Sequence, residues 1–143
     1  MKEIRGRLLG LDFGSRRIGM AVSDPLGVTA QPLPAIQRQG EKKDIEAVAS
    51  VAGEHEVEGV VVGLPLLLDG GEGTQAVLAR RFGEKLRERL GLPVVTWDER
   101  FTTAQAERHL IDSGMRREKR KKVRDSLSAV FLLQSALDAR NRK

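Results

Sequence analysis

The chain has 143 residues and a net charge of +5 at pH 7, from 25 lysines and arginines against 20 aspartates and glutamates. A chain of this length can bury enough surface for one hydrophobic core, so we expect residues 1–143 to form a single domain. The absence of cysteine excludes disulfides, thiolate metal ligands and cysteine nucleophiles, and is compatible with the cytoplasmic location that we expect. No run approaches the ~18 consecutive apolar residues of a membrane span, and the N-terminus lacks the apolar segment of a signal peptide, so neither a membrane partner nor export is expected.

The first third of the chain predicts three strands. They are Arg5–Phe13, Arg17–Asp24 and Val28–Gln37, separated by the turn-forming pair Gly14-Ser15 and by Pro25-Leu26-Gly27. Because such short links join antiparallel neighbours, we expect a three-stranded meander.

Two units of helix followed by strand come next. Apolar residues recur at helical spacing over Asp44–Ala52, and the apolar run Val60–Val62 then indicates a buried strand. Apolar residues four apart predict a second helix up to Leu90, where Gly91 is a good terminator, and Pro93–Trp97 indicates another buried strand. Consecutive crossovers through helices make these two strands parallel.

The C-terminal third predicts a helix from Thr103 to Asp112, a basic loop, and a last helix from Val123 to Ala139. The whole pattern is that of an α/β protein. We expect a mixed five-stranded sheet, made of the antiparallel meander and two parallel crossover strands, with helices on both faces.

The excess positive charge gathers in the segment from Arg116 to Arg124. A basic run of this kind is typical of a surface that binds a polyanion, although a solvated loop with incidental charge has the same composition. Its position immediately before Asp125 favours nucleic acid as the partner.

Two carboxylates lie at the ends of apolar strands. An acid is unfavourable at such a position unless a positive charge lies next to its carboxylate. Asp12 ends the first strand and Glu99 follows the last one. Sites in open α/β sheets lie beyond the carboxyl ends of parallel strands, so these acids can meet around a divalent cation if their strands are close. Successive strand residues face opposite sides, so either Asp98 or Glu99 can face Asp12, and spacing alone does not choose.

Each acid also has an ordinary explanation. Asp125 can stabilise the first turn of a helix through the helix dipole, and Asp12 can prepare the turn at Gly14. Glu99 can pair with Arg100 on the surface. Asp24, which precedes a proline, is more typical of a turn than of a site.

Four motif blocks occur in one order along nearly the whole chain. They are Leu9–Gly14 with Arg17–Asp24, Val61–Pro65 with Asp69-Gly70, Asp98–Thr103, and Lys121–Val123 followed by Asp125. In this order they resemble the YqgF family, also called RuvX, a family of pre-16S rRNA nucleases with the ribonuclease H-like fold.

The resemblance implies that Asp12, Glu99 and Asp125 form an acidic triad that is both catalytic and metal-binding. Carboxylate oxygens favour Mg²⁺ or Mn²⁺, and two such ions can promote in-line hydrolysis of a phosphodiester. Under this hypothesis Asp12 bridges the two ions, and Glu99 and Asp125 complete their coordination.

Further residues are expected around the site. Gly14 would let the substrate approach the backbone, and Thr102 and Thr103, which are helix caps first, would support the site. The residues expected to bind nucleic acid are Arg16, Arg17, Lys119, Arg120, Lys121 and Lys122.

The chain also departs from the family pattern. It has Arg124 where an apolar residue is usual, Ser128 in place of the first of two alanines, and Leu67 in place of an asparagine. These changes bear on substrate contacts more than on metal binding.

The function expected from this resemblance is endonucleolytic processing of the 5′ end of precursor 16S ribosomal RNA. One alternative is resolution of Holliday junctions in branched DNA, which requires a symmetric dimer, whereas RNA processing can use a monomer. A non-catalytic nucleic-acid-binding module is a further alternative. A nucleotide-dependent phosphotransferase, suggested by Asp12–Ser15, is disfavoured because such folds use two domains around the nucleotide.

Overall fold

The structure is a computed structural model. It describes residues 4–65, 67, 69–98 and 117–142, with the backbone alone for residues 117–125. The elements are β1 (Leu8–Phe13), β2 (Arg17–Ser23), β3 (Ala30–Gln37), α1 (Glu41–Glu54), β4 (Gly59–Leu64), α2 (Thr74–Leu90), β5 (Val94–Asp98) and α4 (Arg117–Asn141). Among the helices of these residues, none has the length and apolar composition needed to cross a membrane.

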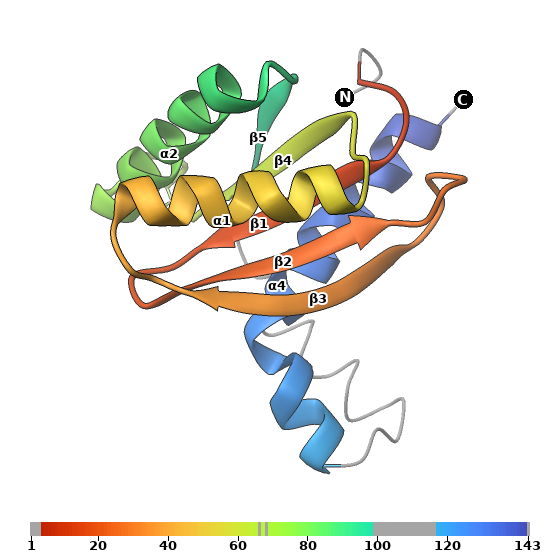
Figure 1. Cartoon of the computed structure of the whole chain (residues 1–143), viewed down its shortest axis with the longest axis horizontal. Helices are drawn as coiled ribbons and strands as arrows, with labels where there is room; N and C mark the ends of the chain where they lie inside the picture. The colour runs from red at the N-terminus through yellow and green to blue at the C-terminus, as the bar shows by residue number, and fades with distance from the viewer. Residues whose placement is uncertain (1–3, 66, 68, 99–116, 143) are drawn as a thin grey trace.

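The strands form one five-stranded sheet in the order β3-β2-β1-β4-β5 (Figure 1). β1 pairs antiparallel with β2, and β2 pairs antiparallel with β3, whereas β1 with β4 and β4 with β5 are parallel. The predicted fold class, an antiparallel meander joined to two parallel crossover strands, is therefore confirmed. β4 lies between β1 and β5, so the strands that lead to Asp12 and Glu99 are not direct neighbours.

Several predicted boundaries shift in the structure. β1 begins at Leu8 rather than Arg5, because Gly6 has a φ of 79° and breaks the extended run before it. α2 ends where it was predicted to end, with Gly91 in the left-handed conformation and its N–H bonded to the carbonyl of Arg87.

The prediction of a basic loop before the last helix is wrong for residues 117–122, which are already helical in α4. Lysine, arginine and glutamate are good helix formers, so the charge pattern that predicted a loop is equally compatible with an exposed helix. The helix predicted from Thr103 to Asp112 lies outside the described residues.

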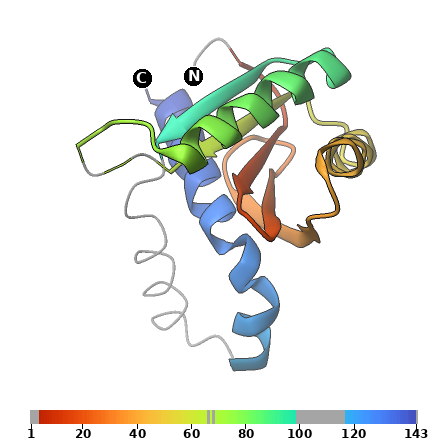
Figure 2. The ribbon, with the colours of Figure 1, turned by 90° about the vertical axis from the view of Figure 1, so that its left-hand side faces the viewer.

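The two faces of the sheet carry different helices. α1 and α2 cover one face and α4 crosses the other (Figures 1 and 2). Side chains of β1 alternate between these faces, with Leu9, Leu11 and Phe13 in the core under α1 and α2 and Leu8 in the core under α4. Asp12 therefore lies on the face that α4 covers.

Gly10 permits the close approach of α4 to the central strand. A Cβ atom at this position would lie 2.8 Å from Cβ of Leu133 and 3.3 Å from the carbonyl oxygen of Ala129. Because the first distance is shorter than any ordinary carbon contact, a side chain here would push the helix away from the sheet.

We predict that Gly10→Ala lowers the free energy of unfolding by about 1–3 kcal/mol, which is typical of overpacking in a core. Denaturant unfolding followed by circular dichroism measures it. Gly53→Ala is the control, because a Cβ at Gly53 meets nothing within 4 Å and alanine is the better helix former. Equal stability of the two variants would show that the packing of α4 on β1 tolerates a side chain at position 10.

Candidate functional site

Asp12 lies near the carboxyl end of the central strand β1, where it is half-buried and paired with Gly19 of β2. Its face is that of Gly10, two residues earlier, which lies against Ala129 and Leu133 of α4. Asp12 is thus held on a rigid element beneath the helix that carries Asp125.

The direction of α4 brings its N-terminal half toward Asp12. At the other end of the helix, Arg140 donates hydrogen bonds to the carbonyls of Ile4 and Gly6, just before β1 begins. Ser126 accepts a hydrogen bond from the N–H of Met20, the residue next to the Gly19 that pairs with Asp12. The backbone at residue 125 therefore lies at the same end of the sheet as Asp12, whereas the side chain of Asp125 lies outside the described residues.

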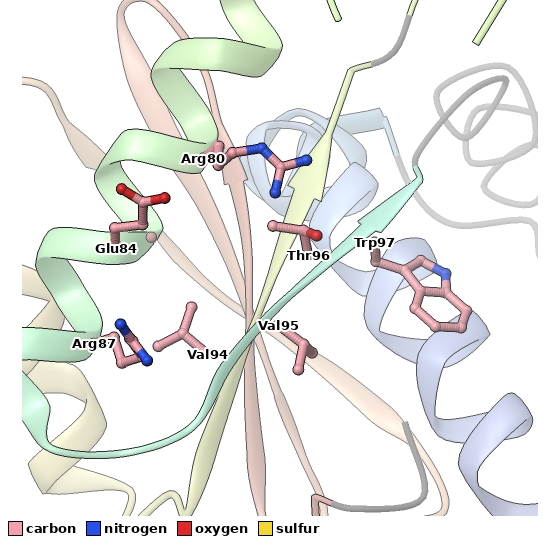
Figure 3. Close-up of a pocket in the computed structure, with 8 residues that line it drawn as sticks. Arg80, Glu84, Arg87, Val94, Val95, Thr96 and Trp97 are labelled. Atoms are coloured by element: carbon pink, nitrogen blue, oxygen red, sulfur yellow. The ribbon is translucent and has the colours of Figure 1, made fainter. Parts of the chain in front are cut away.

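The structure separates Asp98 from Asp12. In Figure 3, Val94 of β5 points toward α2, whereas Trp97 lies against α4, where its indole N–H donates to Ser135. Asp98 is paired with Leu64, which belongs to the core under α1 and α2. Asp98 is therefore on the face opposite to Asp12, while Glu99 lies outside the described residues.

Asp24 lies at the far end of the sheet, because β2 runs antiparallel to β1. Its carboxylate accepts hydrogen bonds from the N–H groups of Val28 and Thr29, at 2.7 and 3.0 Å. The N–H groups of Thr29 and Val28 hold the pKa of Asp24 below its ordinary value. The turn role predicted for Asp24 is confirmed, and it cannot assist a site at Asp12.

The β1–β2 turn brings two predicted phosphate-binding residues to the end of the sheet where Asp12 lies. Arg16 and Arg17 are both exposed there. The N–H of Gly14 bonds to the carbonyl of Arg17 at 3.0 Å, and a Cβ on Gly14 would lie 2.7 Å from that oxygen. Position 14 therefore requires glycine for the turn to close, whether or not a substrate also contacts this backbone.

Arg38 fixes this turn, and sequence reasoning missed it. Its guanidinium donates to Asp44 at 2.7 Å and to the carbonyl of Gly14 at 3.0 Å, and it lies 4.3 Å above the ring of Phe13. Its backbone N–H donates to the carbonyl of Arg16 at 2.8 Å. The contact carries no local sequence signal, because it joins the end of β3 to a turn more than twenty residues earlier.

Asp44 is the buried partner of Arg38. Its side chain is only 1% exposed, and its second oxygen accepts the N–H of Gln39 at 2.9 Å. A buried carboxylate needs a positive partner and hydrogen bonds, and here both are present. The pair ties the turn that follows Asp12 to the first turn of α1.

The structure describes the other predicted site residues only in part. The described backbone of α4 includes Lys119, Arg120, Lys121 and Lys122, without their side chains, and Thr102 and Thr103 lie outside the described residues. Within the described part of the chain, no three histidine, aspartate or glutamate side chains lie close enough to hold a metal ion. The complete triad therefore stays a prediction.

A separate groove of about 460 Å³ follows the edge strand β5 (Figure 3). Arg80, Glu84 and Arg87 of α2 line it on one side, and Thr96 and Trp97 of β5 line it on the other. Asp12 does not line this groove, and the charges of α2 within it have both signs.

Comparison with known proteins identifies the family. The sequence model of the RuvX family, described as Holliday junction resolvase, matches residues 6–139. The chain belongs to the RuvX family. Among similar proteins, the "Putative pre-16S rRNA nuclease" of Koribacter versatilis is 48% identical over 98% of this chain and 94% of that protein. The protein of the same name from Myxococcus xanthus is 47% identical over 93% of this chain and 88% of that protein.

Solved structures confirm the ribonuclease H-like fold of resolvases. T. thermophilus RuvC in complex with a Holliday junction substrate has a TM-score of 0.63 at 17% identity, over 95% of this chain and 96% of that one. Fowlpox virus resolvase in complex with Holliday junction DNA has a TM-score of 0.63 at 12% identity, over 95% of this chain and 99% of that one. The resemblance inferred from the motif blocks is thus confirmed for the family and for the fold.

We predict that Arg38→Leu lowers the free energy of unfolding by about 3 kcal/mol, because it leaves the Asp44 carboxylate buried without its positive partner. Arg89→Leu is the matched control, since Arg89 and Glu46 form an ion pair in which each side chain is 52% exposed. Loss of such an exposed pair costs about 1 kcal/mol at most. Denaturant unfolding of both variants tests this, and equal losses would contradict a special role for the buried pair.

Proposed function

We propose that this RuvX family chain is a divalent-metal-dependent endonuclease that processes the 5′ end of precursor 16S ribosomal RNA. Asp12, Glu99 and Asp125 are the proposed metal ligands and catalytic residues, with Mg²⁺ or Mn²⁺ as the ion. The observation that carries the proposal is the position of Asp12, at the carboxyl end of the central strand and on the face to which α4 brings residue 125.

Helical geometry supports the inclusion of Asp125. Residues four apart share a helix face, so position 125 belongs to the stripe of Ala129 and Leu133, which lies against Gly10. Four residues of helix and two residues of strand each advance by ~6–7 Å. The step from Ala129 back to position 125 and the step from Gly10 forward to Asp12 therefore lead toward the same end of the sheet.

The strand register supports Glu99 over Asp98. Asp98 faces the core under α1 and α2, so the next position of an extended chain would face α4, as Asp12 does. β4 separates β1 from β5 by two strand spacings, ~10 Å in all, which the longer side chain of a glutamate helps to span.

Gly63 of β4 supports the same arrangement. It is paired with Trp97, which packs on the face of α4, so β4 presents no side chain on that face between Asp12 and the end of β5. Glycine inside a strand often marks the close approach of a ligand. Together with hard carboxylate donors, this gap fits a small divalent cation.

In the proposed reaction, the metal and the residues of the chain have different roles. When bound, Mg²⁺ or Mn²⁺ neutralises charge on the phosphate and activates water for in-line displacement. Asp12, Glu99 and Asp125 would hold the metal through their carboxylate oxygens. Arg16 and Arg17, at the same end of the sheet, and Lys119, Arg120, Lys121 and Lys122 of α4 are proposed to bind substrate phosphates.

The names of the two curated relatives favour ribosomal RNA as the substrate. Resolution of Holliday junctions is the second candidate, favoured by the description of the family. Mapping the products on precursor 16S RNA and on a four-way DNA junction separates the two, and the oligomeric state in solution provides a second criterion. A dimer that cuts two opposed strands of the junction, with no cleavage of the RNA, would favour resolution.

We predict that Asp12→Asn lowers cleavage of precursor 16S RNA by more than a hundredfold, while the fold is retained. Removing a group that only hydrogen-bonds to a metal ligand lowers metal affinity or activity by ~10–100-fold, so removing a ligand itself should lower cleavage further. Asp24→Asn is the matched control, because Asp24 lies at the far end of the sheet, and it should cleave as the wild type does. Cleavage should also stop with EDTA and return with Mn²⁺.

Undiminished cleavage by Asp12→Asn, when the variant is purified free of metal and assayed with added Mn²⁺, would refute the proposed site. Salt-sensitive binding of nucleic acid by the wild type, with no cleavage under any metal, would instead favour a non-catalytic binding module.

We also predict that Lys121→Ala combined with Lys122→Ala weakens RNA binding and flattens its salt dependence. Each lost phosphate contact lowers the slope of log affinity against log salt by ~0.7–0.9, so the pair lowers it by ~1.4–1.8. Lys42→Ala with Lys43→Ala is the control, because these exposed lysines begin α1 on the other face of the sheet. Titrations at several salt concentrations measure both slopes, and equal slopes for the two double variants would exclude Lys121 and Lys122 from the interface.

A further inference from the structure

The hydroxyl group of Ser126 is buried at the contact between α4 and the sheet. Ser126 is 2% exposed, and its oxygen accepts the N–H of Met20 on β2 at 3.2 Å. The same hydroxyl donates to the carbonyl of Leu33 on β3 at 2.5 Å. One helix side chain therefore bonds to two neighbouring strands at once.

The two strand residues lie at an irregularity in the sheet. Met20 and Leu33 are partners across β2 and β3, and the register of this pair of strands shifts between Ile18 and Met20. Pro34, which follows Leu33, has no N–H to donate. A serine hydroxyl can donate and accept together, so Ser126 satisfies a donor of β2 and an acceptor of β3 where the pairing is interrupted.

This contact is adjacent to both described parts of the proposed site. Met20 follows Gly19, which pairs with Asp12, and Ser126 follows Asp125 in α4. Hydrogen bonds are directional, so they add to the close packing of the core a fixed pairing of particular groups. The hydroxyl thus fixes the helical turn at residue 125 relative to β2 and β3, and β2 is in turn paired with β1.

We propose that Ser126 is a positioning residue for the metal site. Its hydroxyl holds the Asp125 turn of α4 at the distance from Asp12 that a shared divalent cation requires. This inference rests on the proposed function, in which Asp12 and Asp125 are ligands of the same centre.

Gln134 provides a matched comparison within the same helix. Its side chain accepts the N–H of Ala30 at 2.9 Å and donates to the carbonyl of Val28 at 2.8 Å, so it also joins α4 to one backbone donor and one acceptor. It lies eight residues beyond Ser126, ~12 Å along the helix and away from Asp125. Its loss should loosen α4 without moving the Asp125 turn.

The experiment compares Ser126→Ala with Gln134→Met, two substitutions that remove hydrogen bonds with little change of volume. Binding of Mn²⁺ to the full chain without nucleic acid is measured by electron paramagnetic resonance of the free ion, and thermal unfolding is measured beside it. We expect both variants to melt earlier than the wild type. Only Ser126→Ala should weaken Mn²⁺ binding. We expect a loss of affinity of about tenfold or more, which is typical for residues that orient a metal ligand without binding the metal.

Cleavage kinetics give a second readout. Ser126→Ala should need more Mn²⁺ for half-maximal cleavage and should show a lower kcat, with KM for the nucleic acid within about twofold of the wild type. If Ser126→Ala unfolds below the assay temperature, Ser126→Thr carries the comparison, because it keeps the hydroxyl and should keep the Mn²⁺ affinity.

A folded Ser126→Ala that binds Mn²⁺ as tightly as the wild type and Gln134→Met would overturn the inference, because Ser126 would then only satisfy the irregular strand pairing. Weakened Mn²⁺ binding by a folded Ser126→Thr would also overturn it. Failure of the proposed function is distinct, because the wild type itself would then bind no Mn²⁺, or Asp12→Asn would bind it unchanged.

Discussion

The contact between α4 and the central strand is the constraint on which the rest of this structure depends. The helix reaches β1 because Gly10 has no side chain, so that Leu133 and the carbonyl of Ala129 lie directly against the strand. Asp12 is two residues further along the same face. Any function that needs acids from β1 and α4 to act together requires this approach, since one side chain at Gly10 would separate the two elements.

The two faces of the sheet are held in different ways. Under α1 and α2 the contact is mainly an apolar core, closed at one end by the ion pair of Arg38 and Asp44. Under α4, an apolar core is combined with directional hydrogen bonds from Ser126, Gln134 and Arg140 to backbone groups. Apolar burial stabilises the contact without direction, whereas each of these bonds joins α4 to a particular backbone group. On the face that carries Asp12, the helix is thus joined to the strands by hydrogen bonds as well as by apolar packing.

The predictions that the structure confirms are those that rest on local signals in the sequence. The strands, their directions and the termination of α2 at Gly91 followed from periodicity and turn residues, which are local signals. The basic segment was wrongly predicted as a loop, because residues that form exposed helices also form solvated loops. The motif blocks identified the family correctly. The candidate site was predicted as a set of residues, of which the structure describes Asp12, Gly14, Arg16 and Arg17 and, as backbone alone, Lys119–Lys122 and Asp125.

The sequence by itself determined the fold class, the family and the acid at the end of the first strand, because each is written in contiguous residues. Only the tertiary structure decided that Asp98 faces away from Asp12, that β4 with Gly63 lies between β1 and β5, and that Arg38 and Ser126 fix the elements around Asp12. These facts depend on strand order, on register and on contacts between residues more than a hundred positions apart. No local pattern encodes them, since the free energy that selects one register comes from the packing of the whole sheet against its helices.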